Sequence, residues 1–167
     1  MHNKNWFAVY TRARHEKIVN SSLAEKDIET FLPLIDVISR WKDRKKKVQL
    51  PLFPGYLFVN MNLMELNEIF NVLNTHGVVR ILGNNGEPIP IPIEQIEATR
   101  KLIETKLKFS PFPYYPEGTE VVVVRGPLEG VRGRILQIRG TYRLILSVNL
   151  IKRSVSVEVD IRDIEPE

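Results

Sequence analysis

The residues of this chain best suited to binding chemistry lie between positions 40 and 58. A run of cations, Arg40, Lys42 and Arg44–Lys47, surrounds Trp41. Such cations neutralise phosphates, and an aromatic ring among them can stack on a base. The apolar, aromatic stretch Phe53–Val59 follows a few residues later, and aromatic side chains are frequent anchors of protein interfaces. The two neighbouring segments indicate one module that contacts both nucleic acid and protein.

The sequence has no pattern typical of an enzyme. It contains no P-loop, no Gly-rich dinucleotide turn, no histidine cluster with metal-ligand spacing and no Ser or Cys nucleophile motif. The absence of cysteine excludes disulfides, iron–sulfur clusters and thiolate zinc sites. We therefore expect a protein that is not an enzyme and that uses no cofactor and no metal ion.

The charge of the chain is unevenly distributed. Its net charge is +4, but residues 1–47 hold 11 lysines and arginines against 6 acids, and the remainder holds 13 against 14. This asymmetry points to an acidic partner of the N-terminal part, with nucleic acid the leading candidate. No apolar run approaches the ~20 residues that span a bilayer, and we expect a cytoplasmic protein with no membrane partner.

Residues 1–108 alternate between strand and helix patterns. We expect strands at Trp6–Tyr10, Ile28–Ile38, Val48–Leu52, Tyr56–Met61 and Val78–Leu82, and helices at Arg14–Asp27, Leu63–Leu73 and Glu94–Leu107. The order β-α-β-β-β-α-β-α predicts an α+β N-terminal domain with a ferredoxin-like antiparallel sheet backed by helices. The second and third of these strands would form a hairpin with the cations at its tip.

The remaining residues predict a linker and a small all-β domain. Three prolines and several aromatics in residues 109–116 predict a semi-rigid spacer. In residues 117–167, short apolar runs separated by turn glycines predict a small β-barrel. The strict alternation of Val155–Val159 favours a permanent barrel rather than a helical form.

Several motifs resemble those of the NusG family. The N-terminal half is similar to a NusG N-terminal domain through Trp6–Thr11, His15–Lys17, Phe31–Pro33, Phe53–Tyr56 and Asn74–Arg80. The C-terminal half resembles a KOW domain, an SH3-like barrel, through Gly118–Val121 and Gly126–Gly133. Trp41–Lys47 and Leu150–Val155 look more like specialised paralogues such as UpxY, LoaP and RfaH than like the housekeeping factor.

The resemblance implies a transcription elongation or antitermination factor that binds the clamp helices of bacterial RNA polymerase. Transferred to this chain, the polymerase-binding residues are Tyr10, Phe53, Pro54, Tyr56 and Phe58. Since neighbours in a strand face opposite sides, Tyr56 and Phe58 share one face, which we expect to meet the partner. The alternative is that these aromatics belong to the core.

The resemblance also implies further partners. Upstream or non-template DNA is expected to meet Arg12, Arg14, Arg40, Trp41, Lys42, Arg44, Lys45, Lys46, Lys47 and His76. The alternative is that the charge run is a solvated hairpin end. NusE or Rho would bind the KOW domain at an exposed apolar rim of Leu128, Leu150 and Ile151. We expect a monomer that acts on specific operons; a housekeeping NusG, coupling to Rho or the ribosome, and a translation-side RNA-binding protein are the alternative functions.

Overall fold

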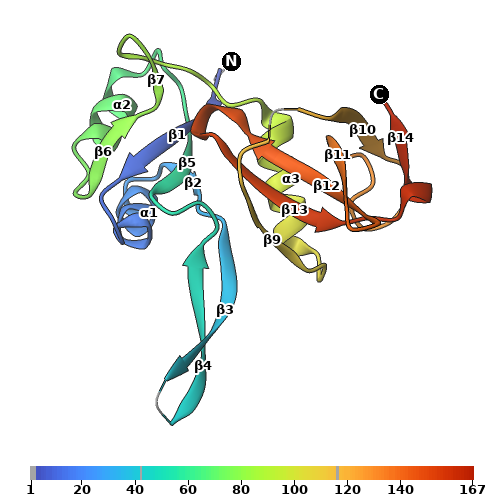
Figure 1. Ribbon diagram of the computed structural model, residues 1–167. Helices are drawn as coiled ribbons and strands as arrows, with labels where there is room; N and C mark the ends of the chain where they lie inside the picture. The colour runs from blue at the N-terminus through green and yellow to red at the C-terminus, as the bar shows by residue number, and fades with distance from the viewer. Residues whose placement is uncertain (1–2, 42, 116) are drawn as a thin grey trace. The chain divides into compact units, whose positions relative to one another are not determined.

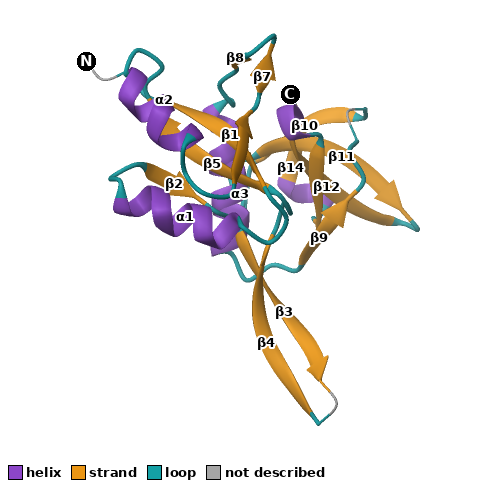
Figure 2. Ribbon diagram, turned by 90° about the vertical axis from the view of Figure 1, so that its left-hand side faces the viewer, coloured by secondary structure: helices purple, strands orange, loops and turns teal. Residues whose placement is uncertain are grey.

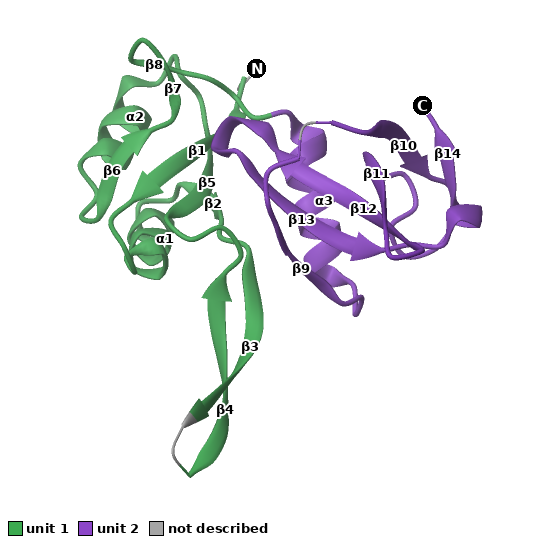
Figure 3. Ribbon diagram, in the orientation of Figure 1, with its two compact units in different colours: residues 1–91 green, residues 92–167 purple. Residues whose placement is uncertain are grey.

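The chain forms two compact units, residues 1–91 and 92–167 (Figure 3). The computed structural model describes residues 3–41, 43–115 and 117–167. In these ranges no helix is long and apolar enough to cross a membrane. The division differs from the expected domains 1–108 and 117–167, because the helix expected to end the first domain makes its contacts in the second unit.

The first unit is built on a four-stranded antiparallel sheet (Figures 1 and 2). Its strands are β1 (Asn5–Thr11), β2 (Glu29–Phe31), β5 (Tyr56–Met61) and β6 (Val78–Ile81), in the spatial order β2-β5-β1-β6. Helix α1 (Glu16–Glu25) joins β1 to β2, and α2 (Leu66–Leu73) joins β5 to β6. The α+β class is confirmed, and this strand order is that of a split β-α-β arrangement.

One face of this sheet packs against the two helices. The core on this face comprises Phe7, Val9, Leu57, Val59 and Met61 from the strands and Val19, Leu23 and Val72 from the helices. All are fully buried, and burial of one such side chain stabilises the fold by ~1.5–3 kcal/mol. Every second side chain of β1 and β5 thus faces the apolar sides of α1 and α2.

Strands β3 (Leu34–Trp41) and β4 (Arg44–Pro51) form a separate two-stranded ribbon that extends away from the sheet of the first unit (Figures 1 and 2). The strand expected over Ile28–Ile38 is divided into β2 and β3. Pro33, which has no N–H to donate, lies between them. Most of the cations expected at the hairpin tip occupy strand positions instead.

A second, much shorter hairpin follows β6. Strands β7 (Gly83–Asn84) and β8 (Glu87–Pro88) are joined by Asn85 and Gly86, with φ angles of 51° and 79°. Two consecutive positive φ angles at Asn-Gly are typical of a type I′ turn.

In its described residues, 92–115 and 117–167, the second unit contains one α-helix and a six-stranded antiparallel sheet (Figure 1). The helix is α3 (Ile93–Glu104). The strands, in the spatial order β14-β10-β11-β12-β13-β9, are β9 (Phe109–Phe112), β10 (Thr119–Val123), β11 (Arg132–Ile138), β12 (Thr141–Val148), β13 (Arg153–Glu158) and β14 (Ile164–Pro166). Two 3₁₀ turns, Asn149–Ile151 and Ile161–Asp163, precede β13 and β14 in the sequence. The strand content expected of this part of the chain is confirmed.

The segment expected to be a spacer forms part of this sheet. Phe109–Phe112 is the edge strand β9, with Ser110 opposite Ser156 and Phe112 opposite Ser154 in β13. An edge strand such as β9 tolerates Pro111, because one side of the strand has no neighbour and a missing N–H on that side costs no hydrogen bond. The first half of the expected semi-rigid spacer, residues 109–116, is therefore a strand of the second unit.

Candidate functional site

Two tyrosines form an aromatic pair at one end of the four-stranded sheet. Tyr10 in β1 lies opposite Tyr56 in β5, and their ring centroids are 5.3 Å apart. Tyr10 is 37% exposed and Tyr56 is half-buried. The pair therefore presents aromatic surface to solvent while its backbone is fixed in the sheet.

A cation lies beside this pair. The guanidinium carbon of Arg80 is 6.0 Å from the centre of the Tyr10 ring, at the limit of a cation–π contact. The two residues are directly opposite each other in the β1–β6 ladder, so their side chains share a face. Arg80 is not among the site residues predicted from the sequence. Its signal was available, since Arg80 is the charged residue in an otherwise apolar strand, Val78–Ile81.

The turn before β5 supports the tyrosine pair. The amide of Tyr56 donates to the carbonyl of Phe53 at 3.0 Å, and Gly55 has a φ of +88°. With Pro54 in the second position, this is the pattern of a type II β-turn. A Cβ on Gly55 would lie 3.2 Å from Cε2 of Tyr10. The turn therefore lies directly against the Tyr10 ring, and Pro54 is exposed beside it.

Two hydrogen bonds attach this turn to the rest of the unit. The carbonyl of Gly55 accepts a bond from the amide of Thr11 at 2.8 Å. The amide of Gly55 donates to Oε1 of Glu16, the first residue of α1, also at 2.8 Å. One glycine thus connects the end of β1 to the start of α1.

Two of the five predicted partner-binding residues belong to the core. Phe53 is 2% exposed and Phe58 is 0% exposed, and their rings pack edge to face with centroids 6.3 Å apart. The prediction that Phe58 shares an exposed face with Tyr56 is wrong. On that face, Ala8 and Phe58 at the centre of the sheet are covered, whereas Tyr10 and Tyr56 at its end keep exposed surface.

Basic and imidazole side chains gather where β1 ends. Arg12, Arg14 and His76 are exposed, and His15 is half-buried. The rings of His15 and His76 meet edge to face at 5.5 Å. The amide of Arg12 donates to the carbonyl of Gly77 at 2.8 Å, which holds the loop after β1 beside the turn before β6. The fold thus brings predicted nucleic-acid contacts from distant parts of the sequence together.

The hairpin of β3 and β4 carries cations on both faces. Residues opposite each other in the ladder share a face. Arg40 lies opposite Lys45 on one face, and Lys46 lies opposite Ser39 on the other, together with Arg44. All of these cations are exposed, as is Lys47. Both faces of the ribbon therefore carry positive charge.

Lys47, Trp41 and Lys42 differ from the other basic and aromatic residues predicted in this hairpin. Lys47 is paired with Asp36, with Nζ and Oδ2 3.1 Å apart, and both side chains are largely solvated. A pair of this kind contributes little to stability. Trp41 is the last residue of β3, but its side chain is not described, and the predicted contact at Lys42 lies outside the described residues.

In the second unit, two of the three predicted partner-binding residues are buried. Leu128 and Ile151 are each 3% exposed, and Leu150 is half-buried. The prediction of an exposed rim is therefore wrong for Leu128 and Ile151. Leu128 lies in a tight turn, where its carbonyl accepts from the amide of Val131, and Ile151 ends a 3₁₀ turn. In these two turns the apolar side chains of Leu128 and Ile151 are buried in the core of the unit.

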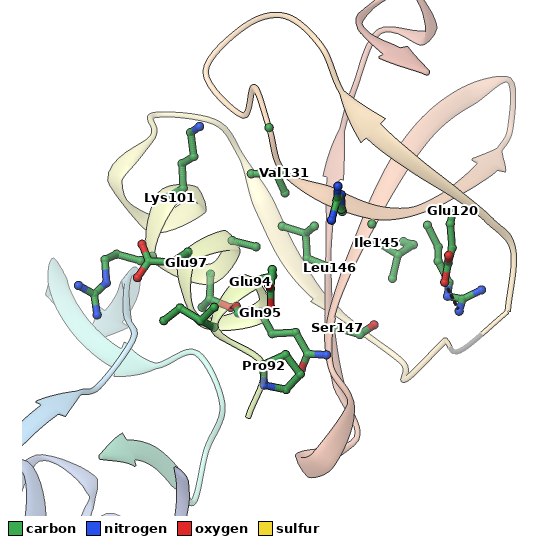
Figure 4. A pocket seen from close by; sticks show the side chains of 18 of the residues that line it. Pro92, Glu94, Gln95, Glu97, Lys101, Glu120, Val131, Ile145, Leu146 and Ser147 are labelled. Atoms are coloured by element: carbon green, nitrogen blue, oxygen red, sulfur yellow. Dashed lines mark hydrogen bonds and ion pairs between the residues drawn. The ribbon is translucent and has the colours of Figure 1, made fainter. Parts of the chain in front are cut away.

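The second unit also contains a cavity of about 810 Å³ (Figure 4). It lies between α3 and the sheet, where Lys101 donates to the carbonyl of Glu129 and the amide of Asn149 donates to Gln95 at 3.2 Å. Its wall includes Ala98, Val131, Ile145 and Leu146, and side chains of both charges, among them Glu94, Glu97, Lys101 and Arg134. The mixture of charges selects neither anions nor cations.

The geometry therefore defines two candidate binding surfaces in the first unit. The tyrosine surface comprises Tyr10, Pro54, Tyr56 and Arg80. The basic hairpin comprises β3 and β4 with Arg40, Arg44, Lys45, Lys46 and Lys47. In the part of the chain that the structure describes, no three His, Asp or Glu side chains lie together as metal ligands would.

Comparison with known proteins places the chain in a family. The model of the family described as "Transcription termination factor nusG" matches residues 4–100. The transcription termination/antitermination protein NusG of Lactococcus lactis is 28% identical, over 98% of this chain and 93% of that protein. The NusG protein of Thermus thermophilus is 29% identical, over 93% of this chain and 94% of that protein. The solved structure of Thermotoga maritima NusG aligns with a TM-score of 0.57 at 22% identity, over 98% of this chain and 97% of that one, which shows a similar fold. The chain belongs to the NusG family, whose members are transcription factors and not enzymes.

Proposed function

We propose that this protein is a transcription elongation and antitermination factor that binds the clamp helices of bacterial RNA polymerase through its tyrosine surface. Proteins of the NusG family work with RNA polymerase. The observation that carries the proposal is the partly exposed pair of Tyr10 and Tyr56, 5.3 Å apart at the open end of a buried sheet.

The physical argument concerns what such a pair offers a partner. Tyrosines with a fixed backbone bury a large area on binding and lose little conformational entropy. Phe53 and Phe58 pack in the core behind this surface and support it. Their role is therefore to hold the surface rather than to touch the clamp. A bound clamp suppresses pausing or termination because the enzyme stays closed around its DNA.

The basic hairpin is the proposed nucleic-acid contact. Its exposed cations suit upstream duplex DNA or the displaced non-template strand, and Arg12, Arg14 and His76 extend the same role to the end of β1. Binding through phosphates requires density of charge rather than exact geometry. We propose that this contact keeps the factor oriented on the elongating enzyme.

The second unit is proposed to be a KOW domain that recruits a further factor. NusE and Rho are the candidate partners, and Leu150 is the one member of the predicted rim that keeps partial exposure. The sequence Ile151-Lys152-Arg153, where the housekeeping factor has Phe-Gly-Arg, supports a specialised, operon-specific role. We also propose that the protein acts as a monomer in the cytoplasm.

In vitro transcription with purified polymerase tests the proposal. The wild-type chain should shorten pauses or increase read-through at terminators, and Tyr56→Ala should lose most of that effect while remaining folded. The matched control is Tyr142→Ala, a half-buried tyrosine of the second unit. A wild-type chain that neither binds polymerase nor changes its elongation would contradict the proposal.

A further inference from the structure

Glu16 is a buried carboxylate with a specific backbone partner. It is 5% exposed, and its Oε1 accepts the hydrogen bond from the amide of Gly55 at 2.8 Å, across 39 residues of sequence. Glutamate is almost never this buried unless its charge is paired or hydrogen-bonded. As the first residue of α1, it also lies at the helix end that favours a negative charge.

The amide of Gly55 is a donor that its own turn does not use. In the turn of Phe53–Tyr56 the hydrogen bond runs from the amide of Tyr56 to the carbonyl of Phe53. A type II turn leaves the amide of its third residue, here Gly55, without a partner inside the turn. Because Gly55 is buried, that amide needs an acceptor from elsewhere in the protein. Glu16 supplies it.

The position of Gly55 determines the surroundings of both tyrosines. A Cβ at Gly55 would lie only 3.2 Å from the ring of Tyr10, and the carbonyl of Gly55 accepts from Thr11, the residue after Tyr10. Tyr56 follows Gly55 directly and begins β5. A displacement of Gly55 therefore changes the packing of Tyr10 and the direction in which Tyr56 leaves the turn.

We propose that Glu16 is a positioning residue of the tyrosine surface. Its carboxylate holds the turn at Gly55, and through this turn it holds Tyr10 and Tyr56 in the arrangement that polymerase binds. This inference rests on the proposed function. The side chain acts by its length and its acceptor oxygen, since it reaches from α1 to a single amide.

Four variants test this role. Glu16→Ala removes the acceptor, Glu16→Asp keeps the charge but is one methylene too short, and Glu16→Gln keeps both length and an acceptor oxygen. Glu25→Ala, an exposed residue at the other end of α1, is the control. The affinity of each full chain is measured for purified bacterial RNA polymerase core enzyme. We expect the Ala and Asp variants to bind about tenfold more weakly, because the turn that orients both tyrosines loses the hydrogen bond that holds it. The Gln variant and the control should bind within about twofold of wild type.

Nuclear magnetic resonance supplies a reading that a general loss of stability would not give. In the Ala and Asp variants the Gly55 amide should shift and exchange faster with solvent, while the amides of the β1–β5 ladder remain protected. If Glu16→Ala does not fold, the affinities of Glu16→Asp and Glu16→Gln for polymerase decide whether Glu16 positions the turn. Equal affinity of the Asp, Gln and wild-type chains overturns the inference, as does loss of amide protection throughout the sheet in Glu16→Asp.

The same series includes Tyr56→Ala, so that two failures can be told apart. If Tyr56→Ala binds weakly and Glu16→Asp binds like wild type, the role of Glu16 is wrong and the proposed function stands. If Tyr56→Ala itself binds like wild type, the tyrosine surface is not the polymerase contact, and both proposals fall.

Discussion

Tyr10 and Arg80 lie opposite each other in the β1–β6 ladder, and Tyr10 also lies opposite Tyr56 in the β1–β5 ladder. The three side chains therefore form a row across one face of the sheet. The guanidinium carbon of Arg80 is 6.0 Å from the centre of the Tyr10 ring. The row combines an aromatic area, which a partner can desolvate, with a charge that can select an acidic group on that partner.

Arg80→Ala should weaken polymerase binding by about two- to fivefold, because a cation–π contact contributes about 0.5–1 kcal/mol at an exposed site. Arg80→Lys should retain part of the affinity, since it keeps the charge but loses the planar group that stacks on the ring. Binding assays with core enzyme would measure both. The exposed Lys108 offers a control, as Lys108→Ala should have no effect. Identical affinities for Arg80→Ala and wild type would remove Arg80 from the surface.

The two faces of the basic hairpin should both contribute to DNA binding. The double variants Arg40→Ala/Lys45→Ala and Arg44→Ala/Lys46→Ala each remove cations from one face. Each should reduce the dependence of log affinity on log salt by about one to two, since every lost phosphate contact lowers the slope by ~0.9 on duplex DNA. Titrations at several salt concentrations would show this. Lys106→Ala/Lys108→Ala is the matched control, and a loss confined to one double variant would show that DNA touches one face only.

Gly55→Ala and Gly86→Ala should differ in their effect on stability. Both glycines have positive φ angles, +88° and +79°, so each substitution carries a backbone cost of ~1–2 kcal/mol. A Cβ at Gly86 meets nothing within 4 Å, whereas one at Gly55 lies 3.2 Å from the Tyr10 ring. Gly55→Ala should therefore lower the free energy of unfolding further, as urea denaturation would measure. Equal losses would mean that the Tyr10 ring moves aside freely.

The turn at Asp160 should give a small, pH-dependent contribution to stability. Side-chain and backbone hydrogen bonds from Arg162 hold the pKa of Asp160 well below its usual range. The contribution is present above the pKa of the unfolded state, near 3.8, and is lost as the pH falls toward the lower, folded value. Asp160→Asn should therefore have a slightly lower melting temperature than wild type between pH 5 and 8. That difference should shrink below about pH 4, and a difference that grows in acid would contradict this assignment.

Periodicity in the sequence was sufficient to predict most elements of the first unit. The alternation in β5 separates Leu57 and Val59, which lie on the helix-covered face, from Tyr56 and Phe58 on the other face. It could not show that Phe58, on the opposite face, is also covered, because alternation separates two faces without saying what lies on either. The same limit applies in α2, where Leu66 and Phe70 follow helical spacing and yet are 77% and 66% exposed.

The remaining differences depend on contacts between residues distant in sequence. Pairing of Phe109–Phe112 with β13 depends on a strand more than forty residues later, which the composition of a proline-rich segment does not reveal. Inward-facing turns at Leu128 and Ile151 likewise depend on a core that is completed only in the folded unit. At Gly55, the bond to Glu16 spans 39 residues of sequence and forms only when the helix and the sheet are in place.

The ladder of β3 and β4 is a sheet of its own, with no strand in common with the four-stranded sheet. Substitutions along it therefore leave the hydrogen bonds of that sheet intact. In evolutionary terms the ribbon is a tolerant site, because its length and charge can change without altering the strand pairing of the four-stranded sheet. The surface around Tyr10 has no such freedom, because changes there alter the packing of the sheet itself.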